Sequence, residues 1–143
     1  MEDQEFTRRV QEEAELGTPD EAAAVVEAVL GTLGEMLSPT ERRHLAAQLP
    51  KSLNGYVTEW MERPPKEKGR PHRFGLEEFY HRVAARSEVR YPAAVKRSQA
   101  VMKVLREAVA PGELANIVRE LPQEYEELLT GTARSPVSPT VVE

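Results

Sequence analysis

The sequence predicts an all-α protein of about eight helices, built as two tandem four-helix repeats that pack into one globule. Prolines lie at the borders of apolar runs and never inside them, which is typical of helix starts. Apolar residues recur at helical spacing, as in Val25, Val29, Leu33 and Leu37, and no segment alternates with the period of a strand. The helices are expected over residues 3–16, 19–37, 39–48, 51–62, 76–90, 92–109, 111–121 and 122–130.

Two of the expected helix starts carry a complete N-terminal signature. Thr18 and Ser38 are each followed by a proline and, three residues after the Ser or Thr, by Glu21 or Glu41. This is the pattern of a capping box, in which the hydroxyl and the glutamate satisfy free backbone N–H groups. Further helices are expected to begin at the other border prolines, which are Pro50, Pro92, Pro111 and Pro122.

An internal repeat appears when the chain is aligned with itself at an offset of 73 residues up to Pro19 and of 72 residues after it. Each copy spans roughly 55 residues, a size that buries too little surface for independent stability. The copies are therefore expected to pack on each other, either about a pseudo-twofold axis or as a short solenoid. Matching positions include Glu5/Glu78, Phe6/Phe79, Arg9/Arg82, Glu15/Glu88, Glu35/Glu107, Glu41/Glu113 and Pro50/Pro122.

The predicted domain organisation follows from this repeat. Residues 1–62 form the first helical repeat, 63–75 a basic, proline-rich linker and 76–130 the second repeat. Residues 131–143 have few apolar side chains to bury and are predicted to be disordered.

Composition excludes several classes of protein. The chain has 143 residues, no cysteine and a net charge of −5, so disulfides, thiol nucleophiles and cysteine–zinc sites are absent. Its longest apolar run is too short for a membrane-spanning helix, and its acidic N-terminus is unlike a secretory signal. We expect a cytoplasmic location and no membrane partner.

The repeated motifs resemble a known bacterial family. FTRRV and AVLGTLGEMLSPTERRHLAAQLP lie between Phe6 and Pro50, and FYHRV and AVMKVLREAVAPGELANIVRELP lie between Phe79 and Pro122. In order and spacing these motifs resemble domain-of-unknown-function family 2267, over nearly everything except linker and tail. The resemblance implies a compact all-helical bacterial protein and no activity. The second copy lacks a Ser cap, since Ala110 stands where the first has Ser38.

Residue patterns typical of catalysis are missing, so the sequence predicts a protein that is not an enzyme and has no cofactor, metal or catalytic residues. His44, His72 and His81 lie outside any metal-ligand motif, and the chain has no glycine-rich phosphate loop or nucleophile elbow. Glu41 and Glu113 are explained here by helix capping and by the favourable field at a helix N-terminus.

Arg9 and Arg82 are singled out because they recur at matching positions. Each follows a glutamate at i−4, Glu5 or Glu78, which favours an ion pair within the helix. The simpler interpretation is that each arginine ties its helix to a neighbour. The alternative is a duplicated anion-binding site.

Charge is distributed unevenly along the chain. Residues 1–62 carry a net charge of −8, whereas the linker carries +4 through Arg63, Lys66, Lys68, Arg70 and Arg73. The simpler interpretation is a solvated linker beside an acidic half. The net charge and the lack of interleaved aromatic residues argue against strong nucleic-acid binding. Trp60, beside the linker, is either a core anchor or part of a docking surface.

The predicted function is that of a non-enzymatic interaction or adaptor module, which binds an unidentified protein or a second copy of itself. The alternative is a regulatory protein that binds nucleic acid or another anion through the linker and through basic residues of the fifth and sixth helices. These are Arg86, Arg90, Lys96, Arg97, Lys103 and Arg106.

Overall fold

The computed structural model describes residues 1–58 and 73–131, and these residues form eight α-helices and no β-strand. The predicted all-α class is therefore confirmed for this part of the chain. No helix among these residues is both long and apolar enough to cross a membrane. The helices are α1 (Asp3–Glu13), α2 (Pro19–Met36), α3 (Pro39–Gln48), α4 (Asn54–Thr58), α5 (Leu76–Ser87), α6 (Tyr91–Ala108), α7 (Pro111–Glu120) and α8 (Tyr125–Thr130).

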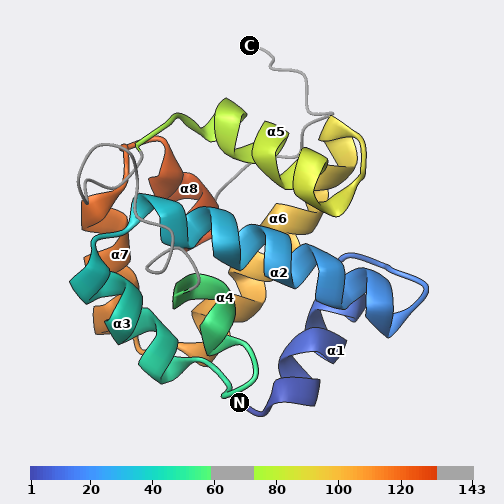
Figure 1. Cartoon of the computed structure of the whole chain (residues 1–143), viewed down its shortest axis with the longest axis horizontal. Coiled ribbons are helices and arrows are strands. Elements are labelled where there is room, and N and C mark those ends of the chain that lie inside the picture. The colour runs from blue at the N-terminus through green and yellow to red at the C-terminus, as the bar shows by residue number, and fades with distance from the viewer. Residues whose placement is uncertain (59–72, 132–143) are drawn as a thin grey trace.

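The two longest helices, α2 and α6, contact each other, and the shorter helices surround them (Figure 1). Helix α1 packs on α2 and also on α6, while α5 packs on α6 and also on α2. Helix α3 contacts α7, α4 packs on α2 and α3, and α8 packs on α6 and α7. The described chain thus has a first half (1–58) and a second half (73–131). The first helix of each half packs on the second helix of the other half: α1 on α6, and α5 on α2.

A single hydrophobic core contains side chains from both halves. Phe6 of α1, Phe79 of α5 and Tyr125 of α8 are among the largest side chains that are fully buried in it. The Phe79 and Tyr125 rings meet edge to face, with centroids 5.6 Å apart. Burial of these large apolar surfaces is the main favourable contribution to folding, and it requires both halves.

The helix starts follow the proline pattern closely. Thr18 forms the predicted capping box, because its hydroxyl accepts a hydrogen bond from the Glu21 N–H while the Glu21 carboxylate accepts one from the Thr18 N–H. Pro39 and Pro111 are the first residues of α3 and α7, and Pro92 is the second residue of α6. At α3 the capping box is incomplete: the Ser38 hydroxyl caps the Glu41 N–H, but the Glu41 side chain points elsewhere.

The helices expected after Pro50 and Pro122 begin later than predicted. Each proline opens a tight turn, closed by hydrogen bonds from Leu53 N to Pro50 O (2.9 Å) and from Tyr125 N to Pro122 O (3.0 Å). Regular helix starts only at Asn54 and Tyr125. Helix α8 is therefore short, and α4 and α8 both carry buried apolar side chains that hold them to the core.

Helices α1 and α5 end earlier than predicted, at Glu13 and Ser87, and each is followed by a left-handed residue at a matching position. Glu15 and Glu88 have φ of 58° and 59°, in the left-handed region. Each reverses the chain in a C-terminal cap, because Leu16 N bonds to Gln11 O and Val89 N bonds to Ala84 O. Glycine usually occupies this position of a helix C-terminal cap, so the glutamates in the sequence do not indicate a left-handed residue here.

We expect Glu88→Gly to raise the free energy of unfolding by about 0.5–1 kcal/mol, because glycine adopts this backbone conformation without the steric cost of a Cβ. Urea denaturation monitored by circular dichroism measures the change. Ala85→Gly, at an exposed interior position of α5, is the control and should cost about 1 kcal/mol. Equal destabilisation by both variants would contradict the prediction.

Helices α2 and α4 approach closely at Gly34. A Cβ at this position would lie 2.5 Å from the carbonyl oxygen of Val57 and 3.2 Å from its carbonyl carbon. The absence of a side chain at Gly34 is therefore what lets the backbone of α4 pack against α2.

Several predictions fall on residues outside the described ranges. These comprise Trp60, His72, most of the 63–75 linker with Arg63, Lys66, Lys68 and Arg70, and the tail beyond Gly131. The domain boundaries at 62 and 63 also lie there. They stay predictions from the sequence.

Candidate functional site

The arginines at matching positions form reciprocal ion pairs between the two halves. Arg9 of α1 donates to Glu107 of α6, with Nη2 3.1 Å from Oε2 and a second contact from Nη1 to Oε1. Arg82 of α5 donates to Glu35 of α2, with Nη1 2.7 Å from Oε1. Each arginine therefore ties the first helix of one half to the second helix of the other.

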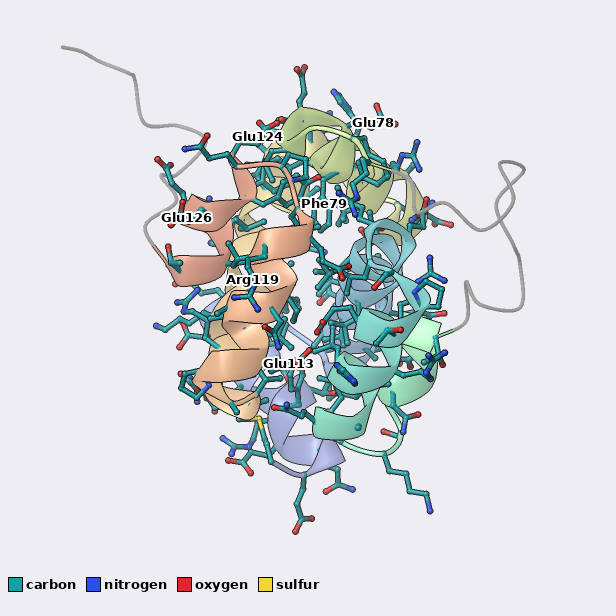
Figure 2. All side chains as sticks on the ribbon, turned by 90° about the vertical axis from the view of Figure 1, so that its left-hand side faces the viewer. Glu78, Phe79, Glu113, Arg119, Glu124 and Glu126 are labelled. Carbon is teal, nitrogen blue, oxygen red and sulfur yellow. The ribbon has the colours of Figure 1, made fainter. Side chains whose placement is uncertain are left out.

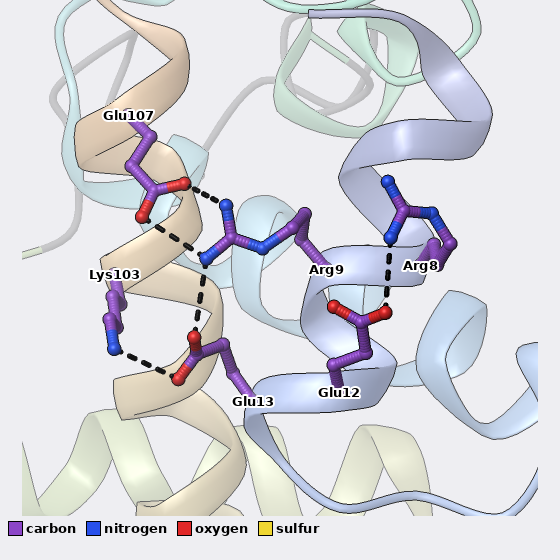
Figure 3. A network of polar contacts seen from close by, with 6 residues as sticks. All are labelled: Arg8, Arg9, Glu12, Glu13, Lys103 and Glu107. Atoms are coloured by element: carbon purple, nitrogen blue, oxygen red, sulfur yellow. Dashed lines mark hydrogen bonds and ion pairs between the residues drawn. The ribbon is translucent and has the colours of Figure 1, made fainter.

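Arg9 belongs to a larger exposed network between α1 and α6 (Figure 3). Its Nη2 lies 3.2 Å from Oε2 of Glu13, whose Oε1 is 3.0 Å from Nζ of Lys103. The expected partner of Arg9 within its own helix, Glu5, is not among its contacts in the described part of the chain. The prediction holds for Arg82, whose Nε lies 2.8 Å from Oε2 of Glu78.

The network makes stability depend on pH through Glu13. The Lys103 hydrogen bond is the main cause that lowers the pKa of Glu13 below its ordinary value of 4.5, with a further contribution from Arg9. A carboxyl group whose pKa is lower in the folded than in the unfolded protein stabilises the fold at pH values above its unfolded-state pKa. That stability is lost as the pH falls through the folded pKa.

We therefore expect Glu13→Gln to be less stable than the wild type at neutral pH, with the difference disappearing below the pKa of folded Glu13. Urea denaturation from pH ~3 to ~7 measures this. Glu12→Gln is the control, because Glu12 is exposed and, among the described residues, pairs only with Arg8 on the same helix, at 3.0 Å. A Glu13→Gln difference independent of pH would contradict the assignment.

Glu35 differs from its counterpart Glu107 in burial. The Glu35 side chain is 3% exposed and that of Glu107 is 38% exposed. Arg82 and Arg86 both form ion pairs with Glu35, and Arg86 also donates to the Thr32 hydroxyl at 2.7 Å. Glu35 is thus a buried charge held by two guanidinium groups of α5.

Arg42 of α3 is a buried cation near the same region. Its Nε donates to the carbonyl oxygen of Gly34 at 2.5 Å. Burial lowers the pKa of Arg42, and the charges of Glu35 and Glu120 act in the opposite direction. Sequence reasoning overlooked Arg42 because nothing in the α3 pattern distinguishes it from the exposed Arg43.

A second set of reciprocal contacts joins the N-termini of α3 and α7 to the opposite half. Ser38 N and Ser38 Oγ both donate to the carboxylate of Glu120, each at 2.8 Å. Ala110 N donates to Oε1 of Gln48 at 2.7 Å. Gln48 and Glu120 occupy matching positions at the ends of α3 and α7, so each helix caps the start of the other.

Glu41 and Glu113 meet between α3 and α7. Both are 6% exposed, and each has an Oε2 atom that makes no hydrogen bond within the described residues. Glu113 lies on the side of α7 that faces α3 (Figure 2). His44, one turn after Glu41, is mostly exposed and has Nδ1 3.9 Å from Oε1 of Glu41. Two buried carboxyl groups, of Glu41 and Glu113, thus lie together, and the more exposed imidazole of His44 lies beside Glu41.

Electrostatics opposes full ionisation of this acid pair. Burial raises the pKa of Glu41 to about 7, and the hydrogen bond and charge of Glu113 act in the same direction. The negative charge of Glu120 adds to this effect, whereas His44 opposes it. A cation or a shared proton between the two carboxyls would relieve the repulsion.

The interpretation of Glu41 and Glu113 as capping residues is therefore wrong for their side chains. Ser38 caps α3 without help from Glu41, and the α7 cap residue, Ala110, has no side-chain hydrogen bond. The recurrence of glutamate at both positions was the available signal. It points to this contact once α3 and α7 are known to be neighbours.

A groove lies elsewhere on the surface, between α1, the start of α2 and the segment leading into α4. Its volume is about 930 Å³. Most of its charged residues are acidic, and its apolar residues come from α2, α4 and the turn before α4. The lining residues are Glu2, Gln4, Glu5, Thr7, Arg8, Gln11, Pro19, Asp20, Ala23, Ser52, Leu53 and Tyr56.

The structure does not gather the site residues predicted from the sequence. Arg9 and Arg82 are engaged by carboxylates of the chain itself, on different helix pairs. Arg73 is exposed, and the remaining linker cations and Trp60 lie outside the described residues.

Fold and contacts together define a small all-helical protein whose halves exchange polar contacts around a buried pair of carboxyl groups. Residues 3–128 match the family described as "Uncharacterized conserved protein (DUF2267)", and the chain belongs to that family. The family membership inferred from the repeated motifs is thereby confirmed. No curated protein matches the chain.

Proposed function

We propose that this protein is a non-enzymatic interaction module that binds a basic, amphipathic segment of a partner protein in the groove beside α1. The acidic, apolar-floored groove is the observation that carries this proposal. The proposal that the chain is not an enzyme rests on the sequence, which has no residue pattern typical of catalysis.

The acidic residues at the rim of the groove favour a basic partner. Glu2, Glu5 and Asp20 are exposed and form no ion pair with another described residue. Arg8 is already paired with Glu12 at 3.0 Å, so it does not balance these acids. A segment with lysines or arginines would complement the rim and gain in association rate and specificity.

The floor of the groove suits apolar side chains. Leu53 and Ala23 are buried or half-buried, and Tyr56 stands half-buried at the wall, with its hydroxyl pKa raised mainly by burial. Partner residues spaced one helical turn apart would fit such a floor beneath a charged rim. Aromatic residues such as Tyr56 often carry much of the binding energy at interfaces.

Fluorescence anisotropy with a basic amphipathic peptide tests the proposal, with an acidic peptide of the same apolar pattern for comparison. Binding should be specific for the basic peptide and should weaken with salt. Asp20→Lys should reduce affinity about tenfold. Glu126→Lys makes the same charge change on exposed α8, away from the groove, and should have little effect. Equal binding of both peptides, or equal losses in both variants, would refute the groove as the site.

Two other uses of the chain lead to different results. Self-association would appear as a concentration-dependent mass in light scattering. Nucleic-acid binding is less supported, because three of the six basic residues singled out on α5 and α6 are in ion pairs with the chain's own acids. These are Arg86, Lys96 and Lys103.

We also infer that the chain arose by tandem duplication and that its halves are related by a pseudo-twofold axis between α2 and α6 and between α3 and α7. The support is reciprocity: Arg9–Glu107 matches Arg82–Glu35, and the Ala110–Gln48 contact matches Ser38–Glu120. A solenoid would not return the second half to the first in this way. The bacterial origin and the cytoplasmic location stay predictions from the resemblance and the composition.

A further inference from the structure

Glu41, His44 and Glu113 place one ligand atom each within 4.8 Å of the others. Glu41 and Glu113 are both the third residue of their helices, α3 and α7, so rigid elements present the two carboxyls. His44 follows Glu41 by three residues and lies on the same side of α3. Two oxygen ligands and one nitrogen ligand thus converge from two helices.

A second observation distinguishes this group from an ordinary surface cluster of acids. Both glutamates are more than nine-tenths buried, and the Oε2 atom of each lacks a hydrogen-bond partner among the described residues. Buried carboxylate oxygens are costly to leave unsatisfied. Of the described groups whose charges act on Glu41, Glu113 and Glu120 are acidic, and His44 alone can be positive.

The ligand set indicates the class of ion. Carboxylates alone suit Mg²⁺ and Ca²⁺, whereas a histidine ligand favours Zn²⁺ and neighbouring transition metals. Metal–ligand bonds of about 2.0–2.2 Å favour ligand atoms somewhat closer together than the 3.9 Å between Nδ1 of His44 and Oε1 of Glu41. The His44 side chain is 58% exposed and can rotate toward the carboxyls without disturbing the core.

We propose that Glu41, His44 and Glu113 bind one divalent transition-metal ion between α3 and α7. The ion bridges the two halves of the chain and supplies the positive charge that the buried carboxylates lack. Its remaining coordination positions, on the side of His44, are filled by water.

Calorimetric titration of ZnCl₂ into the full-length, chelator-treated protein tests this proposal at pH ~8, where ligand protons compete least. The wild type should bind one Zn²⁺ per chain and gain thermal stability. Glu113→Gln and His44→Ala should each weaken binding about tenfold or more. His44 is exposed, so His44→Ala gives an answer even if the buried Glu113→Gln variant does not fold.

His81→Ala is the matched control. His81 is also mostly exposed and lies near a glutamate of its own helix, with Nε2 3.8 Å from Oε2 of Glu77. Among the described residues it has no second, buried carboxylate within reach, so it should not contribute to binding. Zn²⁺ binding that is absent in the wild type up to about 1 mM, unchanged in His44→Ala, or equally reduced in His81→Ala would overturn the proposal.

Discussion

Replacing Glu35 by alanine is expected to lower the free energy of unfolding by about 3 kcal/mol. Glu35 is 3% exposed, and its carboxylate holds both Arg82 and Arg86 against α2. Removing Glu35 takes away the buried carboxylate that Arg82 and Arg86, at 30% and 32% exposure, share. The buried Arg42 is also close enough to sense the Glu35 charge, which increases the cost.

Glu107→Ala provides the comparison, because the Glu107 carboxylate pairs with the matching arginine, Arg9, but is 38% exposed. Water already reaches the Glu107 carboxylate, and Arg9 stays paired with Glu13 after the substitution, so the effect should be far smaller than at Glu35. Urea denaturation of both variants at neutral pH measures the difference. Similar losses at the two positions would show that burial does not determine the strength of these contacts.

Gly34→Ala is the second substitution with a large expected effect, a loss of about 2 kcal/mol in the free energy of unfolding. The new Cβ would stand 2.5 Å from the Val57 carbonyl oxygen, and the clashing atoms belong to backbone, which cannot rotate away. Helix α4 would have to move off α2. Alanine's better helix propensity offsets about 1 kcal/mol of the clash.

Gly112→Ala separates the clash from the propensity change. Gly112 lies in the first turn of α7, and a Cβ there would meet nothing within 4 Å. We expect this variant to be neutral or more stable by up to about 1 kcal/mol. The thermal unfolding midpoint of each variant provides a second measurement. A Gly34→Ala protein as stable as Gly112→Ala would contradict the close approach of α4 to α2.

The sequence predicts the local features of this fold well. The Thr18 cap, the proline starts of α3 and α7, and the ion pair between Glu78 and Arg82 all depend on residues a few positions apart. Their energetics are fixed within one helical turn, so spacing alone identifies them. The left-handed Glu15 and Glu88 are the local exceptions, because glutamate has no preference for that conformation.

Contacts between the halves were beyond local reasoning. Whether Arg9 pairs with Glu5 or with Glu107 depends on which helices become neighbours. The burial of Glu41 depends on the same arrangement. The repeat alone left both a twofold and a solenoid arrangement open, and these place the matching glutamates either together or far apart. The candidate site lies at that long-range contact, so the local capping pattern of α3 and α7 does not reveal it.

The exchange of first helices between the halves has a consequence for cooperativity. Helix α1 packs on α6 as well as on α2, and α5 packs on α2 as well as on α6. Neither half is therefore expected to unfold while the other stays folded, because each half would lose the helix that covers part of its core. We therefore expect partly unfolded species not to accumulate, and a damaging substitution in the core to destabilise both described halves together.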